Sequence, residues 1–359
     1  MRQKKILFVL WSGNLGGSEK HVLDLIRLLP REEFLPSVCF LTEALEMAPI
    51  LAEKKVPFFE VGMRSGIDVL RLPRFKPFLR QGNFDLIHEH GGNKFAVYAY
   101  KLYSPKSRTV FTIHNGELPS DYKKPRLFLE LKKIRNFDRV LSVSERISEA
   151  WRTCSHREIR TVELGVELER FSGVKAYSAD GALVSVSRLI PSKRVPLLVR
   201  LCAPWLKRTG RKLRIAGEGP DRANVEREIQ NLGLESQVEL FGFQPDISEF
   251  LKGSSAFVFA SEFESGPLVV REAMACGLPV ISTFLPSLKG IVQNGETGFL
   301  VEETDFSQMQ KSFETALDAL TANALSGEKF SEASRKTAAR FDEKETARKL
   351  VQIYREKIG

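Results

Sequence analysis

The chain has 359 residues, more than one hydrophobic core usually serves, so we expect two domains. Its 43% hydrophobic and 28% charged residues are ordinary for a soluble globular protein, and no apolar run approaches the roughly eighteen residues that span a bilayer. The net charge of +9 lies mostly in residues 1–172, with 29 Lys and Arg against 21 Asp and Glu. This favours an anionic partner or membrane surface, whereas nucleic acid is disfavoured because no nucleic-acid-binding motif accompanies the charge. The alternative is that the lysines only keep the surface soluble.

The start of the chain and its cysteines indicate a compartment. Residues 1–5 precede a short apolar run and a glycine-rich loop, without a signal-peptide cleavage site. The cysteines are Cys39, Cys154, Cys202 and Cys276. Their wide spacing includes no C-x-x-C and indicates neither a zinc site nor a disulfide framework. We therefore expect a cytoplasmic protein, with the inner face of the membrane as an alternative location.

Short apolar runs alternate with amphipathic helical stretches, the pattern of parallel sheets covered by helices. Strands of the first half are predicted at 6–10, 37–41, 58–61, 86–90, 109–114, 139–144 and 160–164. A second series follows at 182–187, 212–217, 238–243, 256–261, 279–283 and 298–301. The sequence thus predicts an α/β protein with two doubly wound, Rossmann-like domains. Because ligands of such sheets bind beyond the carboxyl ends of the strands, a central cleft between the domains is the expected active site.

The domain boundaries follow from the two strand series. Residues 1–170 form the predicted first domain, and residues 182–340 form the second. Residues 171–181 belong to a polar, glycine-containing stretch and are interpreted as the linker. Residues 341–359 remain as a closing helix.

A glycine-rich loop follows the first strand. Gly13, Gly16 and Gly17 precede a helix that Ser18 is expected to open, and glycines let the backbone approach a ligand closely. Glu43 follows the second strand, where the ribose-binding acid of a dinucleotide site would lie. That alternative is disfavoured because G-x-G-x-x-G is absent.

Histidines end two strands of the first half. His114 closes the strand at 109–114 and is expected at a pKa suited to hydrogen bonding or proton transfer; a loop-capping role is the alternative. His88 and His90 share a strand face and could suggest a metal. Metal binding needs a third ligand that the sequence does not supply, so we expect these two residues to line the cleft.

Two carboxylates of the second half, Glu264 and Glu272, stand eight residues apart. A strand leads into a polar loop, and a helix is expected to open at Pro267, since proline is favoured at the first helical position. The unpaired amides of that helix end would bind a diphosphate, leaving the carboxylates for ribose and sugar hydroxyls. The donor-binding residues expected here are Ser265, Gly266, Pro267, Leu268, Val269 and Glu272. A solvated loop is the alternative interpretation.

Arg188 and Lys193 follow the first strand of the second half. Arginine offers a planar fork for two phosphate oxygens, and lysine supplies a movable point charge. Together they can offset the charge of a diphosphate leaving group without a divalent metal ion, and the sequence has no D-x-D motif. The alternative is that both are surface residues.

Two basic stretches of the first half are candidates for membrane contact. Residues 69–83 mix leucine and phenylalanine with arginine and lysine, but Pro73 and Pro77 interrupt a long amphipathic helix, so a core helix is favoured. The better candidate for a membrane or an acceptor is the cluster of residues 122–126 with Lys132, Lys133 and Arg135.

Several motifs of the second half occur together. The E-x7-E of Glu264 and Glu272, followed by AMACGLPVI and NGETGFLV, resembles the donor site of the retaining family-4 glycosyltransferases, which have the GT-B fold. The family's R-x4-K matches Arg188 and Lys193. Its G-x-G-P turn matches Gly217 to Pro220, and its F-G-F matches Phe241 to Phe243, in the expected order.

The resemblance implies roles for residues. The implied catalytic residues are Arg188, Lys193, Glu264 and His114. Gly16 and Gly17 match a glycine pair that lies against the donor, and Gly217 and Phe243 complete the donor-binding set. The closing helix, at about 342–357, is expected to cross back to the first domain. The stretch LPSLKG replaces the glycine pair that commonly follows the strand PVIST, which puts the identity of the donor sugar in question.

The resemblance implies a retaining, metal-independent hexosyltransferase without a cofactor. It would move a sugar from a nucleotide-diphosphate sugar, its co-substrate, to an acceptor hydroxyl. A lipid-linked or cell-envelope glycan of polysaccharide biosynthesis is the expected acceptor. A GT-B nucleotide-sugar epimerase is the first alternative, although its carboxylates are not evident in the first-domain loops. The second is a non-catalytic nucleotide or carbohydrate binder, against which the intact charged motifs argue.

Overall fold

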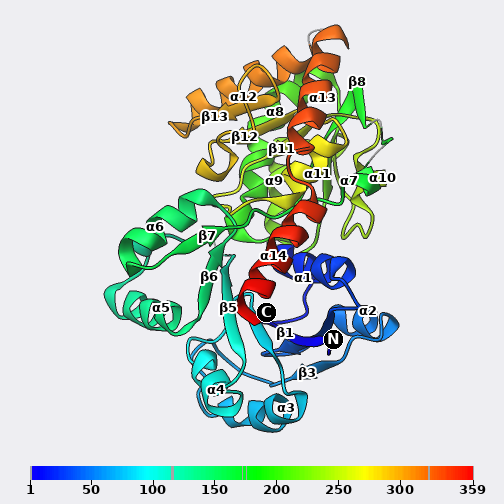
Figure 1. Ribbon diagram of the computed structural model, residues 1–359. Coiled ribbons are helices and arrows are strands. Elements are labelled where there is room, and N and C mark those ends of the chain that lie inside the picture. The colour runs from blue at the N-terminus through cyan, green and yellow to red at the C-terminus, as the bar shows by residue number, and fades with distance from the viewer. Residues whose placement is uncertain (1, 115–116, 172, 175, 322–323, 359) are drawn as a thin grey trace. The chain divides into compact units, whose positions relative to one another are not determined.

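The computed structural model describes residues 2–114, 117–171, 173–174, 176–321 and 324–358. Its internal contacts divide the chain into two compact units (Figure 1). The first unit consists of Met1–Gly165 together with Glu343–Gly359, and the second unit is Val166–Asp342. The central cleft expected between the two domains stays a prediction.

Seven parallel strands form the sheet of the first unit, in the order β3-β2-β1-β4-β5-β6-β7. They are β1 (Lys4–Leu10), β2 (Phe34–Phe40), β3 (Phe58–Glu60), β4 (Leu86–Glu89), β5 (Arg108–Ile113), β6 (Arg139–Ser142) and β7 (Ile159–Thr161). The strand order reverses at β1, where Phe8 pairs with Val38 on one side and with His88 on the other. Ligands of doubly wound sheets bind at such a reversal, so the loops after β1 and β4 are candidate ligand loops.

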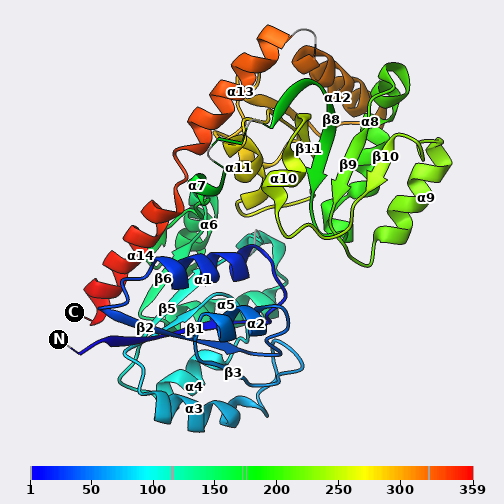
Figure 2. The ribbon, with the colours of Figure 1, turned by 90° about the vertical axis from the view of Figure 1, so that its right-hand side faces the viewer.

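Helices from both ends of the chain pack on this sheet. They are α1 (Gly17–Leu28), α2 (Met47–Glu53), α3 (Phe75–Gly82), α4 (Ala96–Tyr103), α5 (Lys124–Asn136), α6 (Glu145–Ser155) and α14 (Glu343–Ile358), with the 3-10 turns η1 (Leu72–Arg74) and η2 (Pro119–Asp121). α1 and α14 lie side by side, and Arg27 forms an ion pair with Glu343 (Figure 2). Leu25 of α1 shares an apolar cluster with Leu350 and Tyr354 of α14. Burial of this apolar surface holds the last helix on the first unit.

Six parallel strands form the sheet of the second unit, in the order β10-β9-β8-β11-β12-β13. They are β8 (Tyr177–Val186), β9 (Leu213–Ala216), β10 (Val238–Leu240), β11 (Ser254–Phe259), β12 (Val280–Thr283) and β13 (Gly298–Val301). The order reverses between β8 and β11, since β9 and β10 continue to one side and β12 and β13 to the other. The loops after β8 and β11 are therefore the candidate ligand loops of this unit.

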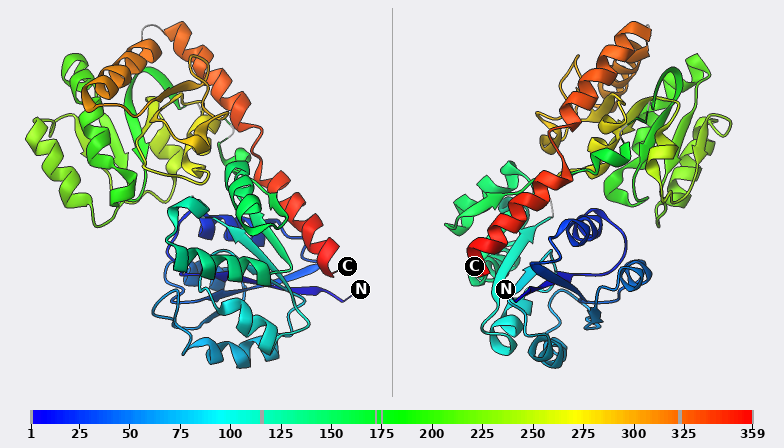
Figure 3. Two further views of the ribbon diagram at one scale, coloured as in Figure 1. Left: turned by 90° about the vertical axis from the view of Figure 1, so that its left-hand side faces the viewer. Right: turned by 45° about the vertical axis from the view of Figure 1, so that its right-hand side comes forward.

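Both faces of the second sheet are covered by helices (Figures 2 and 3). The helices are α7 (Leu168–Phe171), α8 (Val195–Thr209), α9 (Arg222–Leu232), α10 (Ile247–Leu251), α11 (Leu268–Ala275), α12 (Phe306–Thr321) and α13 (Ala324–Ala338), with the turns η3 (Pro191–Lys193) and η4 (Pro286–Leu288). Phe257 and Phe259 of β11 belong to one apolar cluster, and Val258 belongs to the other. This alternation follows from the two-residue period of a strand, and it explains why buried parallel strands are apolar throughout.

All thirteen strands predicted from the apolar runs occur among the described residues, and the α/β class with two parallel sheets is confirmed. Most bounds differ from the prediction by only a few residues. The largest difference is β8, which begins at Tyr177 although its apolar run begins at residue 182. Backbone hydrogen bonding needs no apolar side chain, so the polar start of this strand was not evident.

The linker expected at residues 171–181 is wrong, because this stretch lies inside the second unit. α7 ends at Phe171 and β8 begins at Tyr177. Phe171 and Ala176 are fully buried in the core of the second unit. Two buried side chains in a polar stretch anchor it, whereas composition alone indicated a free connection. The units instead divide after Gly165 and after Asp342.

No helix in the described part of the chain combines the length and the apolar character needed to cross a membrane.

Candidate active site

The loops that follow β8 and β11 are joined in the second unit. The backbone amide of Glu262 donates to the carbonyl oxygen of Ser192 at 2.9 Å. Next to this bond the Lys193 ammonium donates to Oε1 of Glu264. Ser261 Oγ donates to the same carboxylate oxygen at 3.0 Å. The structure therefore brings the predicted residues Lys193 and Glu264 together at the point where the strand order reverses.

Arg194, which the sequence analysis did not single out, fixes this junction. Its Nε donates to the carbonyl oxygen of Ala260 at 2.7 Å, and Nη2 donates to that of Ser261 at 3.0 Å and to Thr283 Oγ1 at 3.3 Å. The guanidinium also pairs with Glu303. Arg194 thus ties the turn carrying Lys193 to the ends of β11 and β12. Its left-handed backbone (φ 49°, ψ 38°) is uncommon for a non-glycine residue and has no sequence signal.

Arg188 is exposed, and its guanidinium forms no hydrogen bond or ion pair with any described residue. Its loop is nevertheless held firmly. The amide of Leu189 donates to the carbonyl oxygen of Glu218 at 2.8 Å, and the amide of Asp221 donates back to that of Leu189 at 2.9 Å. A fixed backbone with an unpaired guanidinium suits an anion ligand, because the five donors of arginine match phosphate oxygens.

The glycines of the G-x-G-P turn are required by close backbone packing. Gly217 and Gly219 have φ values of +139° and +152°. A Cβ at Gly217 would lie 1.8 Å from the carbonyl oxygen of Ser187, and one at Gly219 would lie 2.2 Å from that of Leu189. Gly217 therefore supports the loop that carries Arg188, which is a positioning role. Phe243 lies in a neighbouring loop and is 57% exposed.

α11 begins at Leu268, with Pro267 as its N-cap (φ −68°, ψ 107°). The expected placement of proline at the first helical position is wrong by one residue, because Pro267 keeps an extended ψ while its carbonyl oxygen accepts from the Val270 amide at 3.2 Å. Ser265 is partly buried and Gly266 is buried, while Leu268 and Val269 supply the first helical amides. Glu272 is only 4% exposed. An ionised carboxylate offers two acceptor oxygens, each of which can take more than one hydrogen bond.

In the first unit, the loop after β1 differs in detail from the expectation. α1 begins at Gly17 with Gly16 as its N-cap, so the prediction that Ser18 opens the helix is wrong. Ser18 Oγ instead donates to the Glu19 carboxylate at 2.9 Å. Gly13 cannot carry a side chain in this structure, because a Cβ there would lie 1.7 Å from the carbonyl oxygen of Ala44.

Four histidines from three parts of the chain form a cluster in the first unit. His21 lies on α1, His88 and His90 belong to β4 and its end, and His114 follows β5. The rings of His88 and His90 have centroids 4.0 Å apart, and His90 Nδ1 lies 2.9 Å from His114 Nε2. The centroid of His21 lies 5.6 Å from that of His90 and 5.7 Å from that of His114. No motif of the sequence indicated His21.

His88 is a core residue and does not line a cleft as expected. It is fully buried, with Nδ1 2.7 Å from the Tyr354 hydroxyl and Nε2 2.7 Å from Thr112 Oγ1. Its hydrogen bond to α14 instead helps to fix that helix. Within the described residues, no group of three His, Cys, Asp or Glu side chains is arranged to hold a metal ion.

Burial keeps the clustered histidines neutral. It lowers the pKa of His114 to about 3 and that of His21 to about 4, and it holds the pKa values of His88 and His90 well below the usual range. Desolvation is the main cause, and neighbouring histidines add to it in His88, His90 and His114. The expectation that the pKa of His114 suits proton transfer is therefore wrong. A neutral imidazole still offers one donor and one acceptor.

Two members of the predicted basic cluster, Tyr122 and Lys133, are buried. Lys133 forms an ion pair with the buried Glu89 at 2.6 Å, and its ammonium lies 4.0 Å from the centroid of the Phe111 ring. The Tyr100 hydroxyl donates to Glu89 at 2.8 Å. The prediction that Lys133 belongs to a surface that contacts a membrane or an acceptor is therefore wrong. Neighbouring residues of a helix point in different directions, so Lys133 is buried although Lys132 is exposed.

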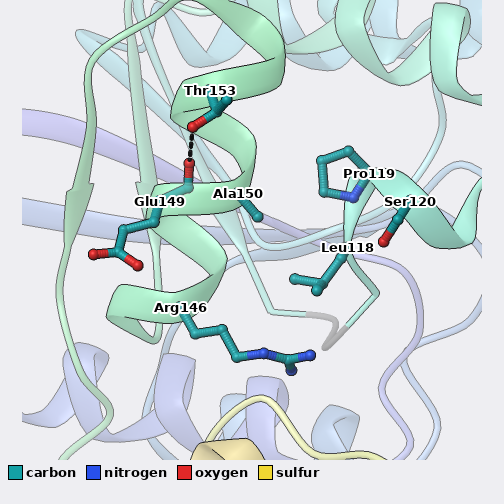
Figure 4. Close-up of a pocket in the computed structure, with 7 residues that line it drawn as sticks. All are labelled: Leu118, Pro119, Ser120, Arg146, Glu149, Ala150 and Thr153. Carbon is teal, nitrogen blue, oxygen red and sulfur yellow. Dashed lines mark hydrogen bonds between the residues drawn. The ribbon is translucent and has the colours of Figure 1, made fainter.

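A pocket of about 450 Å³ opens between η2 and α6 (Figure 4). Its lining residues are Leu118, Pro119, Ser120, Arg146, Glu149, Ala150 and Thr153. Arg146 extends from the start of α6 toward the side of the pocket that Leu118 forms (Figure 4). It is exposed and forms no ion pair with a described residue. Arg146 was not predicted from the sequence, because a single arginine two residues after the helix N-cap Ser144 belongs to no motif.

Two family models together match most of the chain. The model described as "Glycosyltransferase Family 4" matches residues 15–170, and that described as "Glycosyl transferases group 1" matches residues 169–337. The chain belongs to glycosyltransferase family 4. Both units of this glycosyltransferase are included in the matches, and so are the junction of Lys193 with Glu264 and the histidine cluster.

Similar proteins place the family-4 chain among glycosyltransferases with the GT-B fold. N-acetyl-α-D-glucosaminyl L-malate synthase of Bacillus anthracis is 28% identical over 240 residues, 62% of either chain. The chain thus covers less than two thirds of that relative. The phosphatidylinositol N-acetylglucosaminyltransferase GPI3 subunit of Saccharomyces cerevisiae is 24% identical over 95% of this chain and 80% of its own. Anabaena Alr3699/HepE, crystallised with UDP and glucose, superposes with a TM-score of 0.81 at 18% identity, covering 99% of this chain and 100% of its own.

Proposed function

We propose that this glycosyltransferase moves a hexose-type sugar from a UDP-sugar to an acceptor hydroxyl, with retention of anomeric configuration and without a metal ion or cofactor. The observation that carries the proposal is the junction of the loops after β8 and β11, where Lys193 contacts Glu264. Arg188 lies on the same loop as Lys193, and its guanidinium has no partner among the described residues. The choice of UDP is supported by the likeness to HepE, which was crystallised with UDP and glucose.

Each residue of the junction has a distinct task in this proposal. Lysine carries three donor hydrogens, so Lys193 can hold Glu264 and a phosphate oxygen at once. Arg188 takes a second phosphate oxygen, and the two cations stabilise the charge that grows as the sugar–phosphate bond breaks. Oε1 of Glu264 accepts from Lys193 and Ser261, which leaves Oε2 for a sugar hydroxyl. Glu272 accepts hydrogen bonds from the ribose.

The proposal is tested with the full chain and UDP-sugars. We expect calorimetry to show UDP binding with EDTA present, and we expect turnover of a UDP-hexose to continue in excess chelator. The proton NMR spectrum of the product should show the anomeric configuration of the donor. Turnover that stops with EDTA and returns with magnesium would overturn metal independence, whereas binding of GDP or ADP in place of UDP would overturn only the choice of base.

The acceptor is proposed to be anionic, with a lipid-linked or cell-envelope glycan intermediate as its first candidate. Arg146 supplies an unpaired cation beside the 450 Å³ pocket of the first unit, and most of the net charge of the chain lies in its first half. The names of both curated relatives include an anionic compound, L-malate in one and phosphatidylinositol in the other.

Replacement of Arg146 tests the acceptor site. Arg146→Ala should raise the KM for an anionic acceptor about 10- to 100-fold, the loss of one charge-assisted contact of roughly 1.5–3 kcal/mol, and should leave UDP affinity unchanged. Arg135→Ala is the matched control, because Arg135 is also exposed and without an ion pair among the described residues. Equal KM values in both variants would place the acceptor elsewhere, while donor binding would still stand.

A further inference from the structure

His90 has a buried ring that contacts the predicted site residue His114. It is 4% exposed at the end of β4, and its backbone amide donates to the carbonyl oxygen of Val9 at 2.8 Å. Phe8, His21 and His88 surround it, with ring centroids at 5.9, 5.6 and 4.0 Å. A ring packed on these sides has little freedom to turn, because protein interiors are close-packed.

The two nitrogens of His90 are in unequal surroundings. Nδ1 lies 2.9 Å from Nε2 of His114, while Nε2 of His90 is buried and has no hydrogen-bond partner among the described residues. Buried polar atoms without a partner are few in native proteins and call for a reason. Here the reason is that the packing which leaves Nε2 unpaired also aims Nδ1 at His114.

The unpaired atom also indicates where the protons lie. If His114 donated to His90, the neutral His90 ring would carry its hydrogen on Nε2 and bury an N–H group without an acceptor. Buried N–H groups without partners are rarer than buried acceptors without donors. His90 therefore carries its hydrogen on Nδ1 and donates it to Nε2 of His114, so His114 carries its own hydrogen on Nδ1.

We propose that His90 is a positioning residue that occupies Nε2 of His114 and presents Nδ1–H of His114 as a hydrogen-bond donor to an oxygen of the nucleotide-sugar. No described residue bonds Nδ1 of His114, so that nitrogen remains for a ligand. The proposal rests on the proposed function and on the catalytic role that the family resemblance implies for His114. It adds which nitrogen makes the contact and what fixes it.

Neutral rings are required for this arrangement. The titratable groups that face the His90–His114 pair are His21 from α1 and His88 from β4, and both are neutral at pH 7 for the reason given above. A protonated His114 would carry hydrogens on both nitrogens, and the Nδ1–H of His90 would then meet a donor instead of an acceptor. Burial of the cluster thus protects one tautomer.

The test begins with the wild-type protein labelled with ¹⁵N in its histidines. Long-range ¹H–¹⁵N spectra at pH 7.5, with and without UDP, should show His114 protonated at Nδ1 and unprotonated at Nε2. This measurement needs neither turnover nor a variant. A His114 protonated at Nε2 would overturn the proposal even if the enzyme uses UDP-sugars as proposed.

Variants of His90 give the functional test. The side-chain amide of asparagine can occupy the place of Nδ1, whereas that of glutamine reaches the place of Nε2. His90→Asn should therefore retain most of kcat/KM, while His90→Gln and His90→Ala should lose about 10- to 100-fold, as is typical when a residue that orients a ligand-contacting group is removed. UDP affinity should stay at the wild-type level in all three if the oxygen belongs to the sugar, and it should fall together with kcat/KM in His90→Gln and His90→Ala if the oxygen belongs to the diphosphate.

The outcomes separate the two proposals. Equal kcat/KM in His90→Asn, His90→Gln and wild type would overturn the positioning role of His90. A His114→Ala variant with wild-type kcat/KM would remove His114 from donor binding, although the spectrum could still report the tautomer. If His90→Ala does not fold, the comparison of the asparagine and glutamine variants, checked by thermal unfolding, still decides the matter.

Discussion

The candidate sites of the two units differ in how they hold polar groups. In the second unit the groups are charged and lie in loops, with Lys193 paired to Glu264 and Arg188 left exposed. In the first unit they are neutral imidazoles, with His88 and His90 buried and His90 in contact with His114. A charged group keeps its charge where water or an ion pair compensates it, whereas a buried imidazole stays neutral. The proposed function accordingly assigns the diphosphate to the charged loops of the second unit and uncharged hydrogen bonds to the histidines of the first.

The largest effects on kcat are expected from Arg188→Ala and Lys193→Ala, which remove charged groups of the second-unit site. Under the proposed function each change removes a donor to the leaving group, and such donors typically contribute about 10² to 10³ in kcat. The double variant should lose less than the product of the single losses, because both cations act on one diphosphate. Steady-state kinetics with a UDP-sugar and calorimetry with UDP measure the two effects.

Arg227→Ala is the matched control, since Arg227 is exposed on α9 and unpaired among the described residues. It should keep the wild-type kcat. If the Arg188 and Lys193 variants behave as this control does, the cluster is ordinary surface and the proposed mechanism loses its support.

The same contrast explains what the sequence could predict. The second-unit site uses charged residues and glycines close to one another along the chain, so Arg188, Lys193, Glu264 and Gly217 were found as motifs. Arg194 was not predicted, because its four hydrogen-bonded partners lie on loops and strand ends far along the chain.

The first-unit site was harder to predict because it depends on contacts between distant segments. His21 and His90 meet only when α1 packs beside β4, and the sequence showed His90 merely as the second histidine of a pair. The strands were predicted well, since apolar runs report burial on both faces of a parallel sheet. The pKa of His114 was not, because burial depends on the whole packed unit.

The neutral histidines of the first unit are tested by lowering the pH, and we expect a loss of stability smaller in effect than the losses of kcat above. The folded-state pKa values of His21 and His114 are about 4 and 3, below the value of about 6.5 in an unfolded chain. The unfolded state therefore binds more protons between these values, and stability falls as the pH drops below about 6.5. At pH 5 each of the two histidines should cost the first unit on the order of 2 kcal/mol.

All five histidines of the chain lie in the first unit, so the second unit serves as an internal control. Hydrogen exchange read by mass spectrometry at pH 7.5 and pH 5, corrected for the intrinsic rate, should show loss of protection in β4 and β5. Protection in β8 and β11 should change much less. Equal loss in both units would mean that the buried histidines do not govern the acid sensitivity of the first unit.

The smallest expected effect per residue concerns exposed charge on the first unit. Lys123, Lys124 and Lys132 are exposed, unlike Lys133, and a lysine near an anionic membrane contributes about 1 kcal/mol. If the acceptor is lipid-linked, replacing the three by alanine should weaken co-sedimentation with phosphatidylglycerol vesicles. The wild-type binding should fall steeply with salt, because surface charge is screened within about 8 Å at physiological ionic strength.

Alanine at the exposed second-unit residues Lys207, Lys311 and Lys329 is the control for total charge. Equal losses in both triple variants would show that net charge alone drives binding, and absence of binding at low salt would favour an acceptor that is not held in a membrane.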